Sequence, residues 1–164
     1  MKTFLIAALS ADGFIAKTSA HTSMVWTSKE DKQFFVEMTN KAGVVVMGQN
    51  TYETIGKPLP GRHNVVYSRD RQYEGVQVTQ AEPAALLKEL EGKGYKEVAI
   101  CGGATIYTMF MEAGLIDKLY LTVEPIVFGQ GLTLFNKELD VKLALVQTRK
   151  LGEQTLLLEY DVVK

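Results

Sequence analysis

The chain has 164 residues, of which 46% are hydrophobic and 23% are charged, as is usual for one globular domain with a sizeable core. Its formal net charge of −1 argues against nucleic acid or an anionic membrane as the main partner. No apolar run approaches the roughly 18 residues that span a bilayer. The single Cys101 excludes an internal disulfide, and two isolated histidines predict no metal site. We therefore expect one domain over residues 1–164, located in the cytoplasm and bound to neither nucleic acid nor membrane.

The hydrophobic pattern predicts strands that alternate with helices over the first two-thirds of the chain. Strand-like runs cover residues 2–9, 43–48, 64–68, 75–79, 96–101, 117–124, 141–149 and 154–162. Helical patterns cover residues 28–40, 50–55, 82–91 and 104–113. The alternation indicates parallel βαβ units, whereas the last two runs indicate an antiparallel hairpin. We expect an α/β fold with a mixed, mostly parallel sheet of about eight strands, an antiparallel C-terminal strand and about four flanking helices.

The segment from Val44 to Arg62, VVVMGQNTYETIGKPLPGR, combines several signals. Its first four residues predict a buried strand, Gly48 ends that strand, and Asn50 or Thr51 can cap a short helix. A helix N-terminus directly after a strand offers free backbone N–H groups to an anion such as a phosphate. The following Leu-Pro-Gly turn presents Arg62, whose guanidinium can bind a carboxylate or phosphate with two hydrogen bonds.

Asp31 is the first candidate for an acid that takes part in chemistry. A capping-box pattern at residues 27–30 predicts a helix start, which places Asp31, Phe34, Phe35 and Met38 on one helix face. Desolvation at the head of an apolar stripe would raise the pKa of a carboxyl group. The alternative is that acids favour first turns because the helix dipole stabilises them. On the residues alone, this second explanation is favoured.

Gly102 and Gly103 follow one predicted strand and precede a helix. Without side chains at this turn, the phosphates of a ligand could approach the backbone and the helix N-terminus. The alternative is an ordinary tight turn, since two glycines alone are a weak signal. Together with Gly48, the turn would place two helix N-termini side by side at the carboxyl edge of a parallel sheet, which suits a diphosphate.

The run from Met47 to Arg62 resembles the signature of dihydrofolate reductases, Met-Gly-x-x-Thr-[Trp/Tyr]-Glu-x-Ile-Gly-x-Pro-Leu-Pro-Gly-Arg. Further matches follow in the family's order and cover nearly the whole chain: Ile6-Ala7-Ala8, Asp12, Ile15, Trp26, Asp31, Phe35, Gly102-Gly103, Tyr107 and Leu119-Tyr120-Leu121-Thr122. The resemblance implies the three-layer fold of the bacterial-type enzyme. It also implies NADPH-dependent reduction of 7,8-dihydrofolate to tetrahydrofolate, by hydride transfer to C6 and protonation at N5, and binding of antifolate inhibitors.

The resemblance also implies a role for each matching residue. Asp31 would be the catalytic acid, with Trp26 and Thr122 beside it. Six residues would bind the substrate: Ile6, Ala7, Phe35, Ile55, Leu59 and Arg62, the last through the α-carboxylate of the glutamate tail. The residues implied for the cofactor are Ala8, Ile15, Gly48, Gln49, Asn50, Thr51, Tyr67, Ser68, Arg69, Cys101, Gly102, Gly103, Ala104, Thr105, Ile106 and Tyr107.

The chain departs from the family in the residues expected around the 2′-phosphate of NADPH. Gln49 and Thr105 stand where many members carry basic residues that grip this phosphate. We expect Arg69 to compensate, together with His63 or Arg71.

Two further departures concern the substrate and the lid. Lys32 stands where the family usually has an apolar residue of the pterin pocket. If its ammonium reaches the pocket, it lowers the pKa of the neighbouring acid. Residues 16–25 take the place of the family's mobile lid, and this segment is about three residues longer than in common bacterial forms.

Two other functions stay open. Residues 9–16 and 125–135 are also similar to the reductase domains of riboflavin biosynthesis, which reduce a ribosylamino-pyrimidine phosphate with NADPH. The chain could instead be a nucleotide-binding module without catalysis, since fold does not guarantee function. The sequence is compatible with a monomer or a homodimer.

Overall fold

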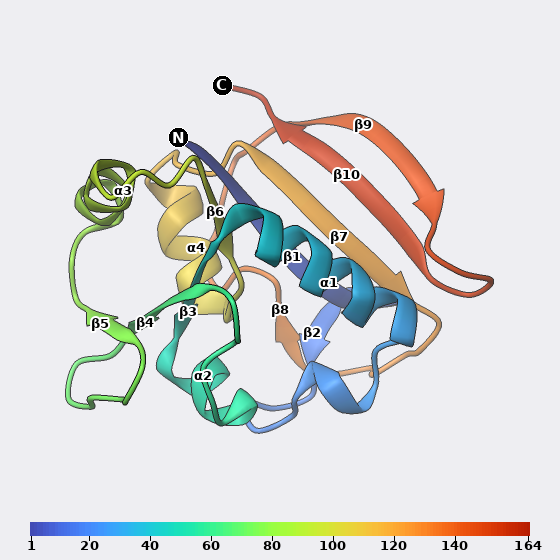
Figure 1. Ribbon diagram of the computed structural model, residues 1–164. Helices are drawn as coiled ribbons and strands as arrows, with labels where there is room; N and C mark the ends of the chain where they lie inside the picture. The colour runs from blue at the N-terminus through green and yellow to red at the C-terminus, as the bar shows by residue number, and fades with distance from the viewer.

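A mixed sheet forms the middle layer of the molecule (Figure 1). The computed structural model describes all residues, 1–164. The eight strands are β1 (Lys2–Ser10), β3 (Val44–Gly48), β4 (His63–Tyr67), β5 (Gln77–Thr79), β6 (Glu97–Ile100), β7 (Lys118–Glu124), β9 (Leu143–Lys150) and β10 (Leu156–Val162). Their order is β5-β4-β3-β6-β1-β7-β10-β9. The first six are parallel, and β10 and β9 close the sheet as an antiparallel hairpin.

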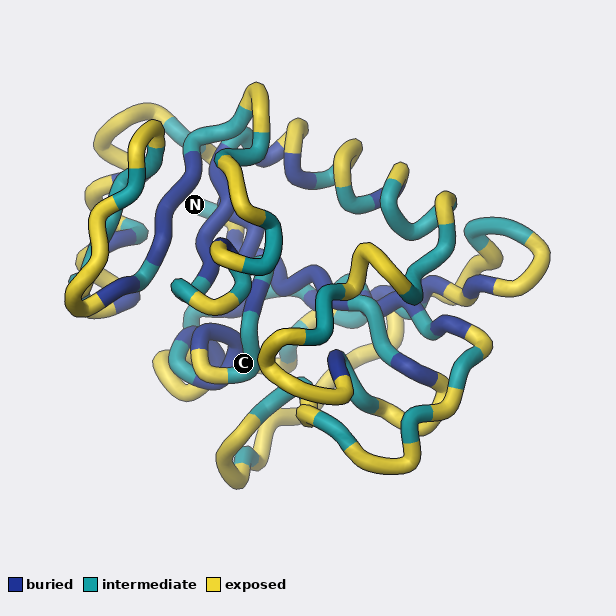
Figure 2. The backbone as a smooth tube through the Cα atoms, turned by 90° about the horizontal axis from the view of Figure 1, so that it is seen from below, coloured by how far each residue is buried: buried dark blue, intermediate teal, exposed yellow.

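Two pairs of helices cover the two faces of the sheet. They are α1 (Lys29–Ala42) and α2 (Gln49–Ile55) on one face, and α3 (Pro83–Gly92) and α4 (Ala104–Glu112) on the other. Side chains of a strand alternate between faces, so Val44 and Val46 pack toward α3 and α4, whereas Val45 and Met47 pack toward α1 and α2. Because both faces are covered, the central strands are apolar throughout and are the most buried part of the chain (Figure 2).

The predicted α/β architecture is confirmed. All eight predicted strands and four predicted helices are present, with ends within two residues of those expected. Three short elements were not predicted: a 3₁₀ helix, η1 (Ser23–Val25), and the strands β2 (Phe14–Ala16) and β8 (Leu132–Thr133), which pair with each other. Elements of two or three residues are too short to show a hydrophobic period, and tertiary pairing forms them.

The predicted cap of the second helix is wrong. We expected Asn50 or Thr51 to cap it, but α2 begins one residue earlier, with Gly48 as N-cap and no side-chain hydrogen bond to the cap. The backbone N–H groups of its first turn therefore have no side-chain partner at the cap. In contrast, Ser28 caps α1 within the range expected, and its Oγ accepts a hydrogen bond from the N–H of Asp31.

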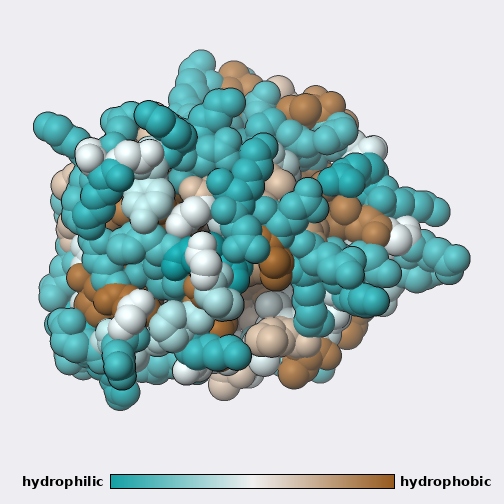
Figure 3. Space-filling model, in the orientation of Figure 1, coloured by the Kyte–Doolittle hydropathy of each residue, from teal (hydrophilic) through white to brown (hydrophobic).

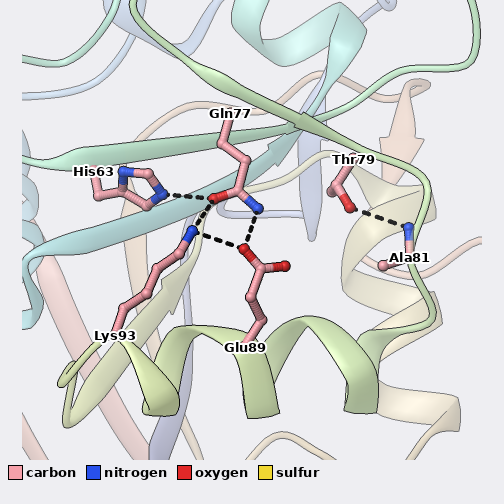
Figure 4. Close-up of polar contacts among 6 residues, drawn as sticks. All are labelled: His63, Gln77, Thr79, Ala81, Glu89 and Lys93. Carbon is pink, nitrogen blue, oxygen red and sulfur yellow. Dashed lines mark hydrogen bonds and ion pairs between the residues drawn. The ribbon is translucent and has the colours of Figure 1, made fainter.

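A polar cluster at the amino end of β4 joins the sheet to α3 (Figure 4). The ring Nε2 of His63 lies 2.8 Å from Oε1 of Gln77, and Lys93 donates to Gln77 at 3.0 Å and to Glu89 at 2.7 Å. This places His63 at the opposite end of β4 from Tyr67, which ends the strand. His63 therefore cannot help to bind a phosphate near Tyr67, contrary to the suggestion from the sequence.

The surface is mostly hydrophilic, and on the side drawn in Figure 3 the hydrophobic residues form separate patches. The edge strand β9 is exposed along its whole length, including Leu145 and Val146. None of the helices has the length and apolar character needed to cross a membrane.

The core of the α3–α4 face predicts the cost of one deletion. Phe110 is fully buried, and its ring meets that of Tyr67 edge to face with 6.2 Å between the ring centroids. We expect Phe110→Ala to lower the free energy of unfolding in urea by about 3–5 kcal/mol, because the cavity cannot close completely. Val127→Ala, at a side chain 70% exposed, should change it by less than about 0.5 kcal/mol. Equal losses in the two variants would contradict this view of the core.

Candidate active site

A cleft of about 1020 Å³ lies at the carboxyl ends of the parallel strands. Open α/β sheets place their ligands at this edge, where loops and helix N-termini meet. Nearly all of the residues predicted for the site line this cleft. The five that do not are Trp26, Thr122, Tyr67, Ser68 and Arg69. The sequence therefore located the cleft, and the structure distinguishes its wall from the residues behind it.

Asp31 lies in the wall of the cleft, in the first turn of α1. Behind it, Thr122 on β7 is 1% exposed, and its hydroxyl donates to Oδ1 of Asp31 at 2.5 Å. Burial raises the pKa of Asp31 and is the largest cause of its shift. The hydrogen bond from Thr122 and the charge of Lys32 lower that pKa, and the charge of Glu124 raises it. The net effect is upward, so Asp31 keeps a proton to higher pH than an exposed aspartate does.

Lys32 also lies in the wall of the cleft. Its Nζ donates a hydrogen bond to the carbonyl oxygen of Thr27 at 2.8 Å, which holds the ammonium near the start of α1. Its effect on the pKa of Asp31 has the direction expected from the sequence, but burial outweighs it.

The part of the cleft predicted for the substrate is largely apolar. Its lining includes Ile6 and Ala7 from β1, and Phe35, Ile55 and Leu59 from the elements around it. A flat heteroaromatic ring suits such walls, with one carboxyl group available to its polar edge.

Arg62 lines the same cleft as Asp31 and is held in place by its own neighbours. Its Nε donates to the carbonyl oxygen of Pro60 at 3.0 Å, and its Nη1 donates to the hydroxyl of Thr39 at 2.8 Å. Two of its five N–H groups are therefore used for positioning, which leaves others for an anionic ligand.

Two strand-to-helix turns form the part of the cleft predicted for the cofactor. The N–H of Gly48, after β3, donates to the carbonyl oxygen of Gly102, after β6, at 2.7 Å, so the turns are adjacent. A Cβ atom on Gly48 would lie 3.1 Å from Cγ1 of Ile106, and one on Gly102 would lie 3.2 Å from Oη of Tyr107. Neither helix N-terminus has a side-chain cap. Close backbone packing and free N–H groups suit a diphosphate, so these residues fit a dinucleotide cofactor.

Tyr107 and Cys101 lie beside these turns as neutral groups. The buried hydroxyl of Tyr107 donates to the carbonyl oxygen of Ile6 at 2.7 Å, and burial raises its pKa well above the usual value. Burial likewise raises the pKa of the Cys101 thiol to about 12. Cys101 is therefore no nucleophile at neutral pH.

Most of the residues expected around a 2′-phosphate already have partners within the protein. Gln49 accepts a hydrogen bond from the hydroxyl of Ser68 at 2.7 Å, and Thr105 accepts one from Asn136 at 3.0 Å. Arg69 is exposed and does not line the cleft. Arg71 forms an ion pair with Glu53 at 3.4 Å. Compensation by Arg69 or Arg71 stays a prediction.

Residues 16–25, predicted as the lid, contribute much of one wall of the cleft. Trp26, which follows them, does not line the cleft itself. Its ring lies 5.0 Å from that of Phe128 and 6.3 Å from that of His21, which does line the cleft. Asp12 holds the Phe128 loop by accepting hydrogen bonds from the N–H groups of Phe128 and Gly129. The predicted lid therefore rests on a loop more than 100 residues away in sequence.

Some residues of the wall were not predicted as site residues. They are Ala16, Thr18, Ser19, His21, Thr22, Ser23, Met24, Thr27, Lys32, Val36, Thr54, Lys57, Gly131, Leu132, Thr133 and Asn136. Most belong to the predicted lid, to β8 and its neighbours or to α1. Only the lid and Lys32 gave a signal in the sequence, since the others reach the cleft through tertiary contacts.

Comparison with known proteins agrees with the geometry. Residues 2–151 match the family model described as dihydrofolate reductase. The chain is 40% identical over 122 residues to dihydrofolate reductase type 3 of Salmonella typhimurium, covering 72% of this chain and 68% of that protein.

Solved structures show the same fold. A putative riboflavin biosynthesis protein from Shewanella sp. PV-4 covers 100% of both chains with a TM-score of 0.85 at 21% identity. The dihydrofolate reductase of Enterococcus faecalis, complexed with NADP(H) and RAB-propyl, has a TM-score of 0.77 at 26% identity and covers 99% of this chain and 97% of that one. The match over residues 2–151, together with the relative at 40% identity, shows that this chain belongs to the dihydrofolate reductase family.

Proposed function

We propose that this protein reduces 7,8-dihydrofolate to 5,6,7,8-tetrahydrofolate with NADPH. The observation that carries the proposal is that Asp31 and Arg62 line one cleft. A pterin ring has a polar edge that a carboxyl group can bind, and its p-aminobenzoyl-glutamate tail ends in carboxylates that a guanidinium can bind. Residues 1–164 would act as one domain. Its cytoplasmic location and its state as a monomer or homodimer stay predictions.

NADPH would lie along the two adjacent turns, at Gly48 and at Gly102 and Gly103, and when bound it supplies the hydride. The chain's own residues bind the pterin beside it, exclude water and provide for the proton. Asp31 holds the polar edge of the pterin and favours protonation at N5, which makes C6 a better hydride acceptor. Thr122 orients the Asp31 carboxyl group through its hydrogen bond. Residues 16–25 exclude water from the cleft.

A second candidate is reduction of a ribosylamino-pyrimidine phosphate. Lys32 supports it, because its ammonium lies in the wall of the cleft beside Asp31 and could bind a phosphate. Likeness in fold to riboflavin-pathway proteins does not decide the substrate.

An absorbance assay separates the two substrates. Loss of NADPH absorbance with dihydrofolate, and no such loss with the pyrimidine, would support the first proposal. Cofactor binding without turnover of either substrate would favour a binding module.

The first variant tests Asp31. We expect Asp31→Asn to lose roughly 10²-fold in kcat/KM at pH 7, because an amide cannot supply the proton that the carboxyl group of Asp31 holds. Steady-state rates between pH 5 and pH 9 check this. Near wild-type rates in a folded variant would remove Asp31 from the mechanism.

The same variant has a stability readout that needs no substrate. Because the folded-state pKa of Asp31 is raised, its contribution to stability is present below the unfolded-state pKa and is lost as pH rises through the folded-state value. Asp31→Asn should therefore be more stable than the wild type at pH 8. Thermal unfolding checks this, since each 1 kcal/mol gained in the free energy of unfolding raises Tm by roughly 2–4 °C.

The second variant tests Arg62. We expect Arg62→Ala to raise KM for dihydrofolate by roughly 10- to 100-fold. The reason is the loss of one charge-assisted contact, which contributes about 1.5–3 kcal/mol of binding free energy. A dihydropterin without the glutamate tail serves as the control, and its KM should not change. An equal effect on both substrates would show that Arg62 supports the fold of the site and does not bind the tail.

The third variant tests Lys32. Since the charge of Lys32 lowers the pKa of Asp31, Lys32→Met should raise that pKa. The decline of kcat/KM on the alkaline side should then begin at higher pH, because Asp31 keeps its proton longer. Unchanged pH–rate profiles in the two proteins would show that the charge of Lys32 does not reach Asp31.

A further inference from the structure

Glu124, the last residue of β7, is a buried carboxylate beside the active site. It is 3% exposed and forms no ion pair. Its Oε2 accepts a hydrogen bond from the N–H of Ser28 at 3.0 Å, and its Oε1 accepts one from the hydroxyl of Ser28 at 2.9 Å. A buried charge without a cation is costly, so these contacts call for a physical explanation.

The hydrogen bonds around Ser28 leave both oxygens of Glu124 as acceptors. The Oγ of Ser28 accepts from the N–H of Asp31 at 3.0 Å and from the hydroxyl of Thr155 at 2.9 Å. Both acceptor positions of the Ser28 hydroxyl are therefore used, and its proton is donated to Glu124. The N–H of Ser28 can only donate. Both oxygens of Glu124 thus act as acceptors, which is the pattern of a carboxylate at a helix N-terminus.

Glu124 also occupies a position that Asp31 would otherwise fill. Ser28 is the N-cap of α1, and Asp31 is three residues later, where an acid normally reaches back to the N-cap N–H in a capping box. Here Glu124 accepts that N–H instead. The carboxyl group of Asp31 is left free to meet Thr122 at the wall of the cleft.

We propose that Glu124 is a positioning residue of this active site, which takes over the helix cap so that Asp31 faces the cleft. Because Ser28 holds the Glu124 carboxylate at the same helix turn, its charge also favours the protonated form of Asp31. The alternation of the strand supports this assignment, since Thr122 and Glu124 lie on the same face of β7 and both contact the first turn of α1. For its effect on turnover, the inference rests on the proposed reduction of dihydrofolate.

The charges near Asp31 are few. From β7 it faces Thr122 and Glu124, and on its own helix it has Lys32. Of these, Glu124 raises the pKa of Asp31, and Lys32 lowers it. From α4 it has Tyr107, a neutral hydroxyl bound to a backbone carbonyl oxygen.

Two substitutions separate charge from position. Glu124→Gln removes the charge but keeps an oxygen that can accept the N–H of Ser28. Glu124→Met removes both, at similar volume. Glu30→Gln is the matched control, because Glu30 lies one residue before Asp31 but packs against Gly152. Circular dichroism and urea unfolding establish that each variant is folded.

The first measurement is the pKa of Asp31 in the free protein, from ¹³C NMR of labelled aspartate carboxyl groups, with Asp31→Asn for assignment. We expect a lower value in Glu124→Gln and in Glu124→Met than in the wild type, and no change in Glu30→Gln. Unchanged values in both folded Glu124 variants would overturn the electrostatic role. This measurement uses no substrate, so it is independent of the proposed function.

The second measurement is the pH dependence of kcat with dihydrofolate. In Glu124→Gln we expect rates within about twofold of the wild type at the acidic limit and a decline that begins at lower pH. At a pH above the pKa of Asp31 in both proteins, the rate should fall in proportion to the protonated fraction of Asp31, which the NMR titration gives directly. Glu124→Met should also lose rate at the acidic limit, because Asp31 can turn back to Ser28.

The outcomes separate the two proposals. A shifted Asp31 pKa with unshifted pH–rate profiles would overturn the effect of Glu124 on turnover while the proposed reaction stands. Equal rates for Glu124→Met and Glu124→Gln at the acidic limit would overturn the positioning role. A wild type that does not turn over dihydrofolate would overturn the proposed reaction, and the NMR titration would still decide the electrostatic effect of Glu124.

Discussion

The contact between the first turn of α1 and the end of β7 is the constraint on which the site depends. It joins Asp31 to Thr122, 91 residues later in the chain, and Ser28 to Glu124, 96 residues later. Desolvating a carboxyl group is unfavourable unless hydrogen bonds compensate for the lost water. The fold supplies them by running β7 parallel to β1 and next to it, so that the carboxyl end of β7 reaches the start of α1. An acid can thus be buried in the wall of a cleft and still be held in one orientation.

Much of the fold follows from the sequence, because strongly apolar segments leave little choice. The run from Val44 to Met47 is apolar at every position, and such a run is stable only with helices on both faces of the sheet. The short pair β2 and β8 could not be predicted, because its strands form only when distant loops meet over the cleft. The predicted N-cap of α2 was wrong for a related reason. Asn50 and Thr51 are residue types that favour the N-cap, but Gly48, which contacts Gly102, begins the helix earlier.

The site shows the same division between local and long-range information. Residues on contiguous motifs, such as Gly48 and Arg62, were located in the cleft from the sequence. Residues that act through distant partners were not: Trp26 packs on Phe128 and does not line the cleft, and Glu124 was not predicted as a site residue. The alternation of this strand gave no signal for Glu124, because it falls on the face of Lys118, Tyr120 and Thr122, opposite the apolar Leu119, Leu121 and Val123. Only the folded structure shows that Glu124 accepts hydrogen bonds from Ser28 at the start of α1.

The substrate of such a site is decided by the charges in the cleft, since proteins of this fold with low sequence identity superimpose well and carry different names. Here one cation and one anion act on Asp31. Lys32 on the same helix favours the ionised acid, and Glu124 on β7 favours the protonated acid. The two charges act in opposite directions on the pKa of one carboxyl group, so Glu124 offsets part of the effect of Lys32. Without Glu124, the Asp31 carboxyl group beside Lys32 would be protonated to a smaller extent at a given pH. Glu124 thus allows this cleft to carry a second cation for an anionic ligand and to keep an acid that burial has already made easy to protonate.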